Sequence, residues 1–497
     1  MNQQSHTPEQ GIAHKVTRGI GWNYLSFGIG KTVSLITVSV LAHLLTPVNF
    51  GVVALASLAI EYLSVLNDFG LATALIQRRE KIDEASNVVF TLNLIVSVSL
   101  TLITILLAPL AAIYFREPNL TPILRWLGLT FTINALGSVH KARLQRDMKF
   151  GKTLVPELGN NIVKAAVSIG MALAGYGAWS LVYGQIIGLS VSIILLWVMI
   201  PWIPQLSLIS HTARQLFRYG ISIMADRALN IFGDSFDYFL IGRFFDTAAL
   251  GIYTLAYKLP ELLIITTLNV LGGVFFPAFS TIQNDPAKLR KSFLATTRYV
   301  QLLVTPMCLG MIVGADPIIR VAFGDQWLEA IPLMQILCLH TLVLSIGYHV
   351  GDIYKAIGRP DILIKLAIPI FIIRVIAIWF GAKQGLTGVA FGHLFATSVE
   401  LIMRTIITVN VLKLSVFEIL KQMTAFIGGA ALLICTIPIF VASSTLPPLP
   451  RLIMIVAAGA TGYLVIIWYI ERETLSKVLK IVGVKLLGTH QSKQNEI

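Results

Sequence analysis

The chain has 497 residues, of which 56% are hydrophobic and only 13% are charged, and its mean hydropathy is +0.78. Soluble domains carry about 25% charged residues, so this composition excludes an ordinary soluble protein and predicts one that lies mostly in lipid. The formal net charge of +13 needs its own explanation, because a basic balance also occurs in proteins that bind nucleic acid.

The first nineteen residues are polar and lack the apolar core and cleavage site of a signal peptide, so we expect the first apolar segment to remain as a helix. Apolar runs long enough to cross a hydrocarbon core of ~30 Å recur along the whole chain. The expected spans are 20–43, 50–76, 87–108, 121–140, 154–174, 177–199, 217–241, 249–275, 299–321, 328–349, 361–381, 386–410, 423–441 and 451–470. The fold class is therefore an all-α polytopic membrane protein with about 14 transmembrane helices.

Positive charges divide the connecting segments into two alternating sets. About 25 Lys and Arg residues fall in one set and about six in the other. Since Lys and Arg favour the cytoplasmic side, and the basic set includes both ends of the chain, both termini are expected in the cytoplasm. Topology and anionic lipid headgroups then explain the net charge, so we expect membrane lipids and no nucleic acid as partners.

An internal repeat is consistent with the expected number of helices. The sequence LAHLLTPVNFGVVALASLAIE from Leu41 aligns without a gap on IGRFFDTAALGIYTLAYKLPE from Ile241, at an offset of 200 residues. The identical pairs are Gly51 and Gly251, Leu55 and Leu255, Ala56 and Ala256, and Glu61 and Glu261. Both copies run from an odd-numbered helix through a short outside turn into the next helix, which predicts two lobes of equal orientation about an axis along the membrane normal.

The expected organisation follows from this repeat. Helices one to six form a lobe over 1–205, helices seven to twelve form a second lobe over 206–412, and a helix pair with a cytoplasmic tail occupies 413–497.

Charged residues inside the membrane are the main functional signal, because each costs ~2.5–3.5 kcal/mol at a helix centre and needs a partner or a wet cavity. In the seventh expected helix, one stripe about 100° wide holds Asp226, Arg227, Asn230, Asp234 and Asp237. Such a stripe faces protein or water. Lys31 in the first helix lies as far from the cytoplasmic end as Arg227 does in the seventh, about mid-membrane.

Other polar residues carry weaker signals. A stripe that includes Glu157 and Lys164 favours internal ion pairs, and His393 is interpreted as a hydrogen-bonded packing residue. The three cysteines have no paired spacing, so neither disulfides nor a metal site is expected. No catalytic residues are expected, since the outside loops are short and the sequence lacks metal–sugar, paired-His and Gly-rich phosphate motifs. We therefore do not expect an enzyme.

Six stretches resemble the polysaccharide flippases of the Wzx type, in particular the branch of colanic acid and teichuronic acid exporters. They are LAHLLTPVNFGVVALA, NDFGLATALIQRRE, RDMKFGK, GYGAWSLV, DYFLIGRFFDTAALGIYTLAYKLPELL and FPAFSTIQND. The resemblance covers roughly residues 15 to 440, and the superfamily also contains MATE drug exporters and the lipid II flippase MurJ. One departure is His43, where Arg243 of the second repeat predicts an arginine.

The resemblance implies two six-helix lobes around a central cavity, alternating access, and a bacterial cytoplasmic (inner) membrane location. The implied cargo is an oligosaccharide repeat unit linked to undecaprenyl diphosphate, for export of an O-antigen, exopolysaccharide or capsule. Polysaccharide polymerase and export machinery are the further partners that it suggests. A MATE-like ion-coupled exporter of small organic molecules is the alternative, although acids would then be expected to outnumber bases in the cavity.

Helices one and seven face the cavity in that family, so Lys31 and Arg227 are implied to meet the diphosphate, whose oxygens suit cationic donors. Lys258, Glu261, Asp234 and Asp237 are expected to complete this substrate cavity. The competing interpretation is that Lys31 and Arg227 neutralise Asp234 or Asp237 for packing alone. No soluble cofactor is expected.

Coupling to an H⁺ or Na⁺ gradient would require an acid within the membrane. The candidates are Glu61, Asp68, Asp234 and Asp237, with Glu261 as a repeat-related fifth.

Overall fold

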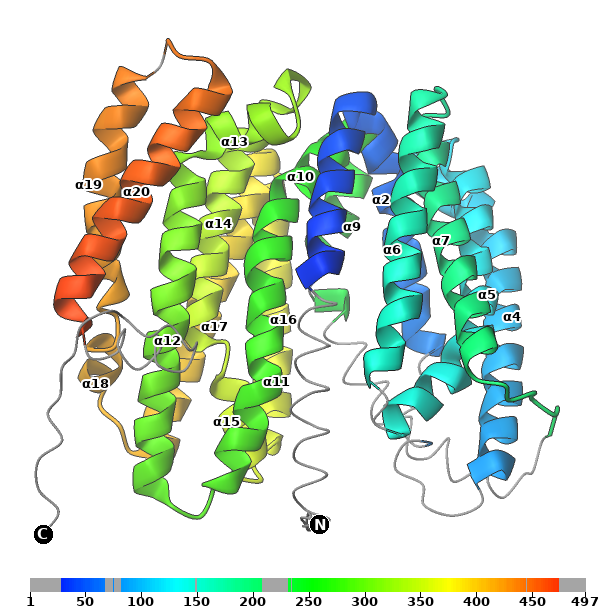
Figure 1. Cartoon of the computed structure of the whole chain (residues 1–497), viewed down its shortest axis with the longest axis horizontal. Coiled ribbons are helices and arrows are strands. Elements are labelled where there is room, and N and C mark those ends of the chain that lie inside the picture. The colour runs from blue at the N-terminus through cyan, green and yellow to red at the C-terminus, as the bar shows by residue number, and fades with distance from the viewer. Residues whose placement is uncertain are drawn as a thin grey trace, which may run out of the picture. The chain divides into compact units, whose positions relative to one another are not determined.

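A computed structural model describes residues 28–67, 75, 82–147, 150–207, 231–233, 235–443 and 445–472 (Figure 1). All regular elements in these ranges are helical. The earlier elements are Gly28–Leu44, α2 (Pro47–Asn67), α4 (Ile82–Phe115), α5 (Leu120–Arg146), α6 (Phe150–Leu173), α7 (Ala178–Met199) and α9 (Phe236–Phe244). The later ones are α10 (Thr247–Pro260), the π-helical η1 (Glu261–Ile265), α11 (Thr266–Thr281), α12 (Pro286–Val313), α13 (Ala315–Ala322), the 3-10 turn η2 (Asp325–Trp327), α14 (Ala330–Gly347), α15 (Val350–Ala356), α16 (Asp361–Ala382), α17 (Leu386–Leu412), α18 (Val416–Leu420), α19 (Ala425–Ala442) and α20 (Pro448–Ile470).

Within the described residues, nine helical segments are long and apolar enough to cross a membrane, or ten if α12 and α13 count as one bent span. Helices α5 and α6 coincide with two further expected spans but carry more polar side chains. The expected helices at 20–43 and 217–241 lie only partly within the described ranges. The multi-pass helical fold is thus confirmed, while the count of 14 and the orientation of the ends stay predictions.

One expected span has a different form. Residues 299–321 were expected as a single helix, but α12 ends at Val313 and α13 continues at 79° to it. Gly314 lies at the break and Pro317 follows it. Since proline has no amide hydrogen for the bond that a continuous helix would make back to Val313, the helix changes direction here.

Capping residues determine where several helices begin. The Asp246 carboxylate accepts a hydrogen bond from the Ala249 amide (2.7 Å) and starts α10. Asp285 does the same for the Lys288 amide (3.0 Å) at the start of α12, and these hydrogen bonds hold the pKa of Asp285 below its usual value. Ser415 and Glu418 form a reciprocal capping box that begins α18.

The described residues pack into two compact units. The first comprises the described parts of Met1–Leu263 with Ile319–Leu337 and Asp361–Glu400, and the second comprises Ile264–Ile318, Cys338–Pro360 and the described part of Leu401–Ile497. Each unit is treated by itself below. These units do not correspond to the predicted lobes, whose boundaries at 205 and 412 stay a prediction.

Small residues allow close helix contacts in the first unit, where α6 and α7 lie side by side (Figure 1). A Cβ atom at Gly184 of α7 would lie 1.8 Å from the Ser168 Oγ of α6, and one at Gly188 would lie 2.7 Å from the Asn160 Oδ1. Backbones can approach this closely only where a side chain is missing, which is how membrane helices pack when lipid supplies no hydrophobic force.

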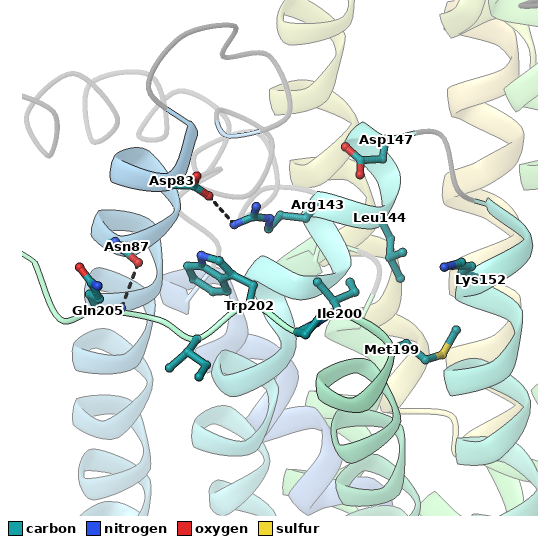
Figure 2. A pocket seen from close by; sticks show the side chains of 12 residues that line it. Asp83, Asn87, Arg143, Leu144, Asp147, Lys152, Met199, Ile200, Trp202 and Gln205 are labelled. Carbon is teal, nitrogen blue, oxygen red and sulfur yellow. Dashed lines mark hydrogen bonds and ion pairs between the residues drawn. The ribbon is translucent and has the colours of Figure 1, made fainter.

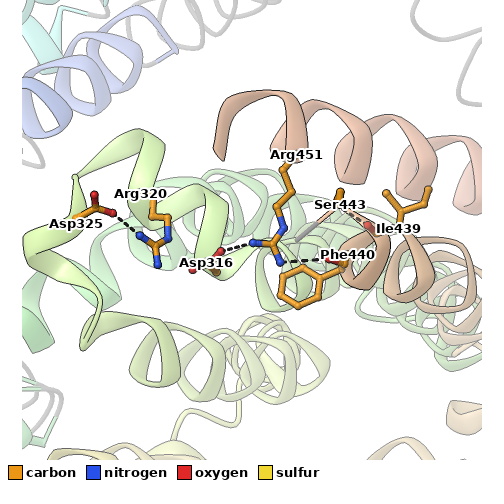
Figure 3. Close-up of polar contacts among 7 residues, drawn as sticks. All are labelled: Asp316, Arg320, Asp325, Ile439, Phe440, Ser443 and Arg451. Atoms are coloured by element: carbon orange, nitrogen blue, oxygen red, sulfur yellow. Dashed lines mark hydrogen bonds and ion pairs between the residues drawn. The ribbon is translucent and has the colours of Figure 1, made fainter. Parts of the chain in front are cut away.

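In the second unit, ion pairs hold the last two helices against α12 and α13. Arg451 of α20 donates to Asp316 of α13 (2.7 Å) and to the Phe440 carbonyl of α19 (3.2 Å), as Figure 3 shows. At the other end of the hairpin, Arg298 of α12 donates to the fully buried Glu471 (2.7 Å). The α19–α20 hairpin is therefore anchored near both of its ends.

Candidate transport site

Lys258 and Glu261 form an ion pair in the first unit. The Lys258 Nζ donates to the Glu261 Oε2 at 3.0 Å, and both side chains are partly exposed. Lys258 lies about eleven residues after the start of α10, which places it ~16 Å along the helix. Pro260 and the π-helical η1 interrupt the regular helix here, and such π-turns occur frequently at functional sites.

Two further lysines interact with this pair. Lys31, about thirteen residues from the end of its helix at Leu44, is attracted by Glu261 and repelled by Lys258. Lys164 of α6 is also repelled by Lys258. Lys258 thus interacts with lysines of two other helices, while Glu261 interacts with Lys31 and Lys258, and the summed charge of the four side chains is positive. We refer to Lys31, Lys164, Lys258 and Glu261 as the lysine cluster.

Asp237 of α9 forms a separate buried network in the same unit. Its carboxylate is 1% exposed and accepts hydrogen bonds from the Tyr253 hydroxyl (2.7 Å) and the Tyr238 amide (2.9 Å). The Nδ1 of His393 in α17 lies 3.3 Å from the same carboxylate. Side chains from α9, α10 and α17 therefore converge on this one acid, which we call the Asp237 network.

Glu61, the repeat equivalent of Glu261, has different contacts. Its carboxylate accepts a hydrogen bond from the Ser235 hydroxyl (3.2 Å), and the neighbouring Tyr62 donates to the Ser235 carbonyl (3.1 Å). These bonds connect α2 to the residue that precedes α9.

Three predicted site residues, Asp68, Arg227 and Asp234, lie outside the described residues. The roles of Lys31, Lys258, Glu261, Asp237 and Glu61 stay predictions as well. What the structure adds is their placement: Lys31, Lys258 and Glu261 come together, whereas Asp237 and Glu61 have the separate contacts described above.

Three residues with charged or titratable contacts were not among the predicted site residues. Lys164 was assigned to internal ion pairs within its own stripe, and His393 to packing. Arg374 was passed over, although a charge in the middle of an apolar segment is itself a signal. It donates to Glu400 of α17 (3.1 Å), and both side chains are largely buried.

A cavity of about 710 Å³ opens elsewhere in the first unit, at one end of α4 to α7 (Figure 2). Arg143 lies 2.9 Å from the Asp83 carboxylate and over the ring of Trp202 (5.1 Å). The Gln205 amide donates to the Asn87 Oδ1 (3.0 Å). These contacts hold the extended segment after α7 across the ends of α4 and α5. None of the predicted site residues that the structure describes lines this cavity.

Charged groups buried among apolar helices define a class of protein, the polytopic membrane transporters, because such groups mark substrate and ion pathways. Residues 40–332 match the family model described as "Polysaccharide biosynthesis protein". This chain belongs to that family, and it is a multi-pass protein of the bacterial inner membrane.

Curated relatives support the assignment. The chain is 25% identical to the lipopolysaccharide biosynthesis protein WzxC of Escherichia coli over 399 residues, which are 79% of this chain and 80% of WzxC. It is 24% identical to the teichuronic acid biosynthesis protein TuaB of Bacillus subtilis over 480 residues, 94% and 98% of the two chains. The succinoglycan biosynthesis transport protein ExoT of Rhizobium meliloti is 26% identical over 75% of this chain and 76% of its own.

Solved structures share the fold. The lipid II flippase MurJ in an inward closed conformation matches with a TM-score of 0.75 at 15% identity, covering 91% of this chain and 99% of its own. An inward-facing MATE multidrug transporter matches with a TM-score of 0.58 at 15% identity, over 79% of this chain and 96% of its own.

Proposed function

We propose that this protein flips oligosaccharide repeat units, linked to undecaprenyl diphosphate, across the inner membrane for export of a surface polysaccharide. The family supports this proposal, as do relatives named for lipopolysaccharide, teichuronic acid and succinoglycan biosynthesis. We also propose that it acts by alternating access and performs no chemical reaction on its cargo. The fold is that of MurJ and the MATE transporters.

The observation that carries the proposal is the lysine cluster. Three lysines and one glutamate carry a net charge of +2 when all are ionised, and a diphosphate would balance that charge. Ammonium groups inside a membrane protein are costly unless an anion or water compensates their charge. An excess of lysines over acids therefore suits a site that binds an anionic cargo and holds water between transport cycles. Arg227, which the sequence predicts to join the cluster, would add a planar donor suited to phosphate oxygens.

The proposed topology has about 14 transmembrane helices with both ends in the cytoplasm. Its lobes are 1–205 and 206–412, followed by the C-terminal hairpin and tail of 413–497. Contacts with a polysaccharide polymerase and export machinery are part of the same proposal, because a flipped repeat unit needs an enzyme that consumes it on the other side of the membrane.

We further propose that an H⁺ gradient drives transport through Asp237 and His393, in preference to Na⁺. An imidazole and a carboxylate can each take up and release a proton, and here the Nδ1 of His393 lies 3.3 Å from the buried Asp237 carboxylate. The other ionisable groups that interact with Asp237 are Tyr62, Tyr238 and Tyr253. Glu61 acts on the first two of these tyrosines, and Glu261 and Tyr257 act on Tyr238.

The test of the cargo is mass spectrometry of lipid extracts after depletion of the protein in its host, with the leaflet of any lipid-linked sugar probed in spheroplasts. Complete repeat units should accumulate on the cytoplasmic side, and the wild-type gene should clear them. Lys258→Gln should fail to clear them. Lys365→Gln, which changes an exposed lysine paired with Asp361, is the matched control and should act as wild type.

Unchanged lipid-linked sugars together with loss of small-molecule efflux would overturn the proposal and favour the MATE-like alternative. For the coupling step, His393→Gln should abolish the dependence of flipping on an imposed H⁺ gradient, because glutamine cannot take up a proton. His340→Gln, a change at another buried histidine, should retain that dependence.

A further inference from the structure

Helices α2 and α10 cross at two glycines that the sequence repeat makes equivalent. A Cβ atom at Gly51 would lie 1.6 Å from the Thr247 carbonyl oxygen, and one at Gly251 would lie 2.0 Å from the Pro47 carbonyl oxygen. Pro47 and Thr247 are themselves 200 residues apart, so the contact is reciprocal, as two-fold symmetry requires. The backbones touch here, and neither position can hold a side chain in this arrangement.

A second set of contacts lies beside this crossing. The Trp327 indole donates to the Ala42 carbonyl (2.9 Å), and the Gln326 amide donates to the carbonyls of Ala42 (2.6 Å) and Leu45 (3.2 Å). Trp327 is fully buried and packs edge-on against Phe50 of α2 (5.3 Å between ring centroids). Segments from both predicted lobes therefore meet at the predicted outside turn of the first repeat.

The crossing has a defined place relative to the lysine cluster. Gly251 precedes Lys258 by about two turns of α10, or ~10 Å along the helix axis, on the side of the predicted outside turn. A glycan held at the cluster cannot pass between two helices whose backbones are in contact. In the predicted topology the crossing therefore lies between Lys258 and the outer side of the membrane.

We infer that the Gly51–Gly251 crossing, together with Gln326 and Trp327, is the outer seal of the transport path and separates in each cycle. That the seal blocks the path of a lipid-linked sugar rests on the proposed function, whereas the location of the seal rests on the contacts alone. Glycine at both positions allows the seal to close completely. A methyl group at either one opposes closure and shifts the population towards the outward-open state.

The experiment measures access to a cysteine placed just inside the seal. Thr254 is one turn inward of Gly251 and one turn before Lys258, on the same face of α10 as Lys258. Thr254→Cys is introduced into full-length protein that carries Cys435→Ser, since Cys435 is exposed whereas Cys308 and Cys338 are buried. The probe is a membrane-impermeant charged maleimide added to the outside of spheroplasts.

Labelling should be slow with the seal intact. Gly51→Ala and Gly251→Ala should each raise the labelling rate about tenfold, which corresponds to a population shift of about 1.4 kcal/mol. Gly170→Ala is the control, because this helical glycine of α6 has open space where its Cβ would be. Trp327→Phe removes the indole donor without adding volume and should give a smaller rise, which keeps the test valid if an alanine variant does not insert.

Unchanged labelling in the inserted variants would overturn the inference, and so would a rise seen only with probe on the cytoplasmic side. Labelling requires no cargo, so the outcome is independent of the flipping test. If the variants label faster but the protein moves no lipid-linked sugar, the seal is supported and the proposed cargo is wrong.

Discussion

The two repeat-related helix pairs match at their outer ends and differ farther in. Gly51 and Gly251 make reciprocal contacts, yet Glu61 and Glu261, ten residues later, have different partners. Lys258 stands where the first repeat has Leu58, and Pro260 stands where it has Ile60. The identical glycines form the crossing of the two helices, whereas Lys258, at a position that diverged, adds a positive charge beside Glu261.

The Asp237 network follows the same rule. The repeat equivalents of Asp237 and Tyr253 are Thr37 and Val53, which cannot form a carboxylate–phenol hydrogen bond. At the outer turn, His43 bonds the Ser39 carbonyl (2.8 Å), whereas Arg243 lies over the ring of Tyr114 (5.1 Å). The contacts are therefore symmetric where the two backbones touch, and they differ where polar and charged side chains interact.

Exchanging the residues at positions 60 and 260 should reveal the largest difference in stability between the two repeats. Ile60→Pro removes a backbone hydrogen bond from the uninterrupted α2 and should cost about 3 kcal/mol of stability. Pro260→Ile should cost far less, because the helix is already interrupted there by η1. Thermal unfolding in detergent measures both, and equal losses would contradict the asymmetry.

Neutralising the lysine cluster should impair transport next most strongly. Lys258→Gln should lower the rate of flipping by about ten- to a hundredfold, as expected for loss of a charged hydrogen bond worth ~1.5–3 kcal/mol. Glu61→Gln should leave the rate nearly unchanged, because the amide oxygen can still accept from Ser235. Flipping in proteoliposomes with a lipid-linked sugar tests the pair, and a severe defect in Glu61→Gln would show that the first repeat also carries function.

The glycine crossing should respond equally from either side. Gly51→Ala and Gly251→Ala each place a methyl group against a partner's carbonyl oxygen, so each should destabilise the closed form by about 1–3 kcal/mol. Detergent unfolding midpoints should fall by similar amounts in the two variants. A large difference between the two midpoints would mean that the contact is reciprocal in geometry but not in its contribution to stability.

The smallest effect is expected at the start of α10. Asp246→Ala removes the acceptor for the Ala249 amide and should cost about 1 kcal/mol of stability. Asp246→Asn retains an acceptor and should restore most of the loss in the same unfolding measurement. A loss as large as that of Ile60→Pro would indicate a role for Asp246 beyond capping.

Much of this architecture could be predicted from the sequence. Apolar length predicts helices because lipid offers no partner for backbone groups. Among the described residues the helices overlap the expected spans, except that the span at 299–321 is broken at Gly314. The reciprocal contacts of Gly51 and Gly251 are those that the repeat offset of 200 residues, found from four identities, leads one to expect. The resemblance to polysaccharide flippases is confirmed by the family match.

Only the tertiary structure decided which charged groups meet. Lys164 and Lys258 are far apart in sequence, as are Asp237 and His393, and local patterns carry no information on such distant partners. The sequence by itself determined helices, repeat and family, because these depend on hydrophobicity and local order along the chain. In contrast, packing between helices decides which residues meet in the lysine cluster, in the Asp237 network and at the outer seal.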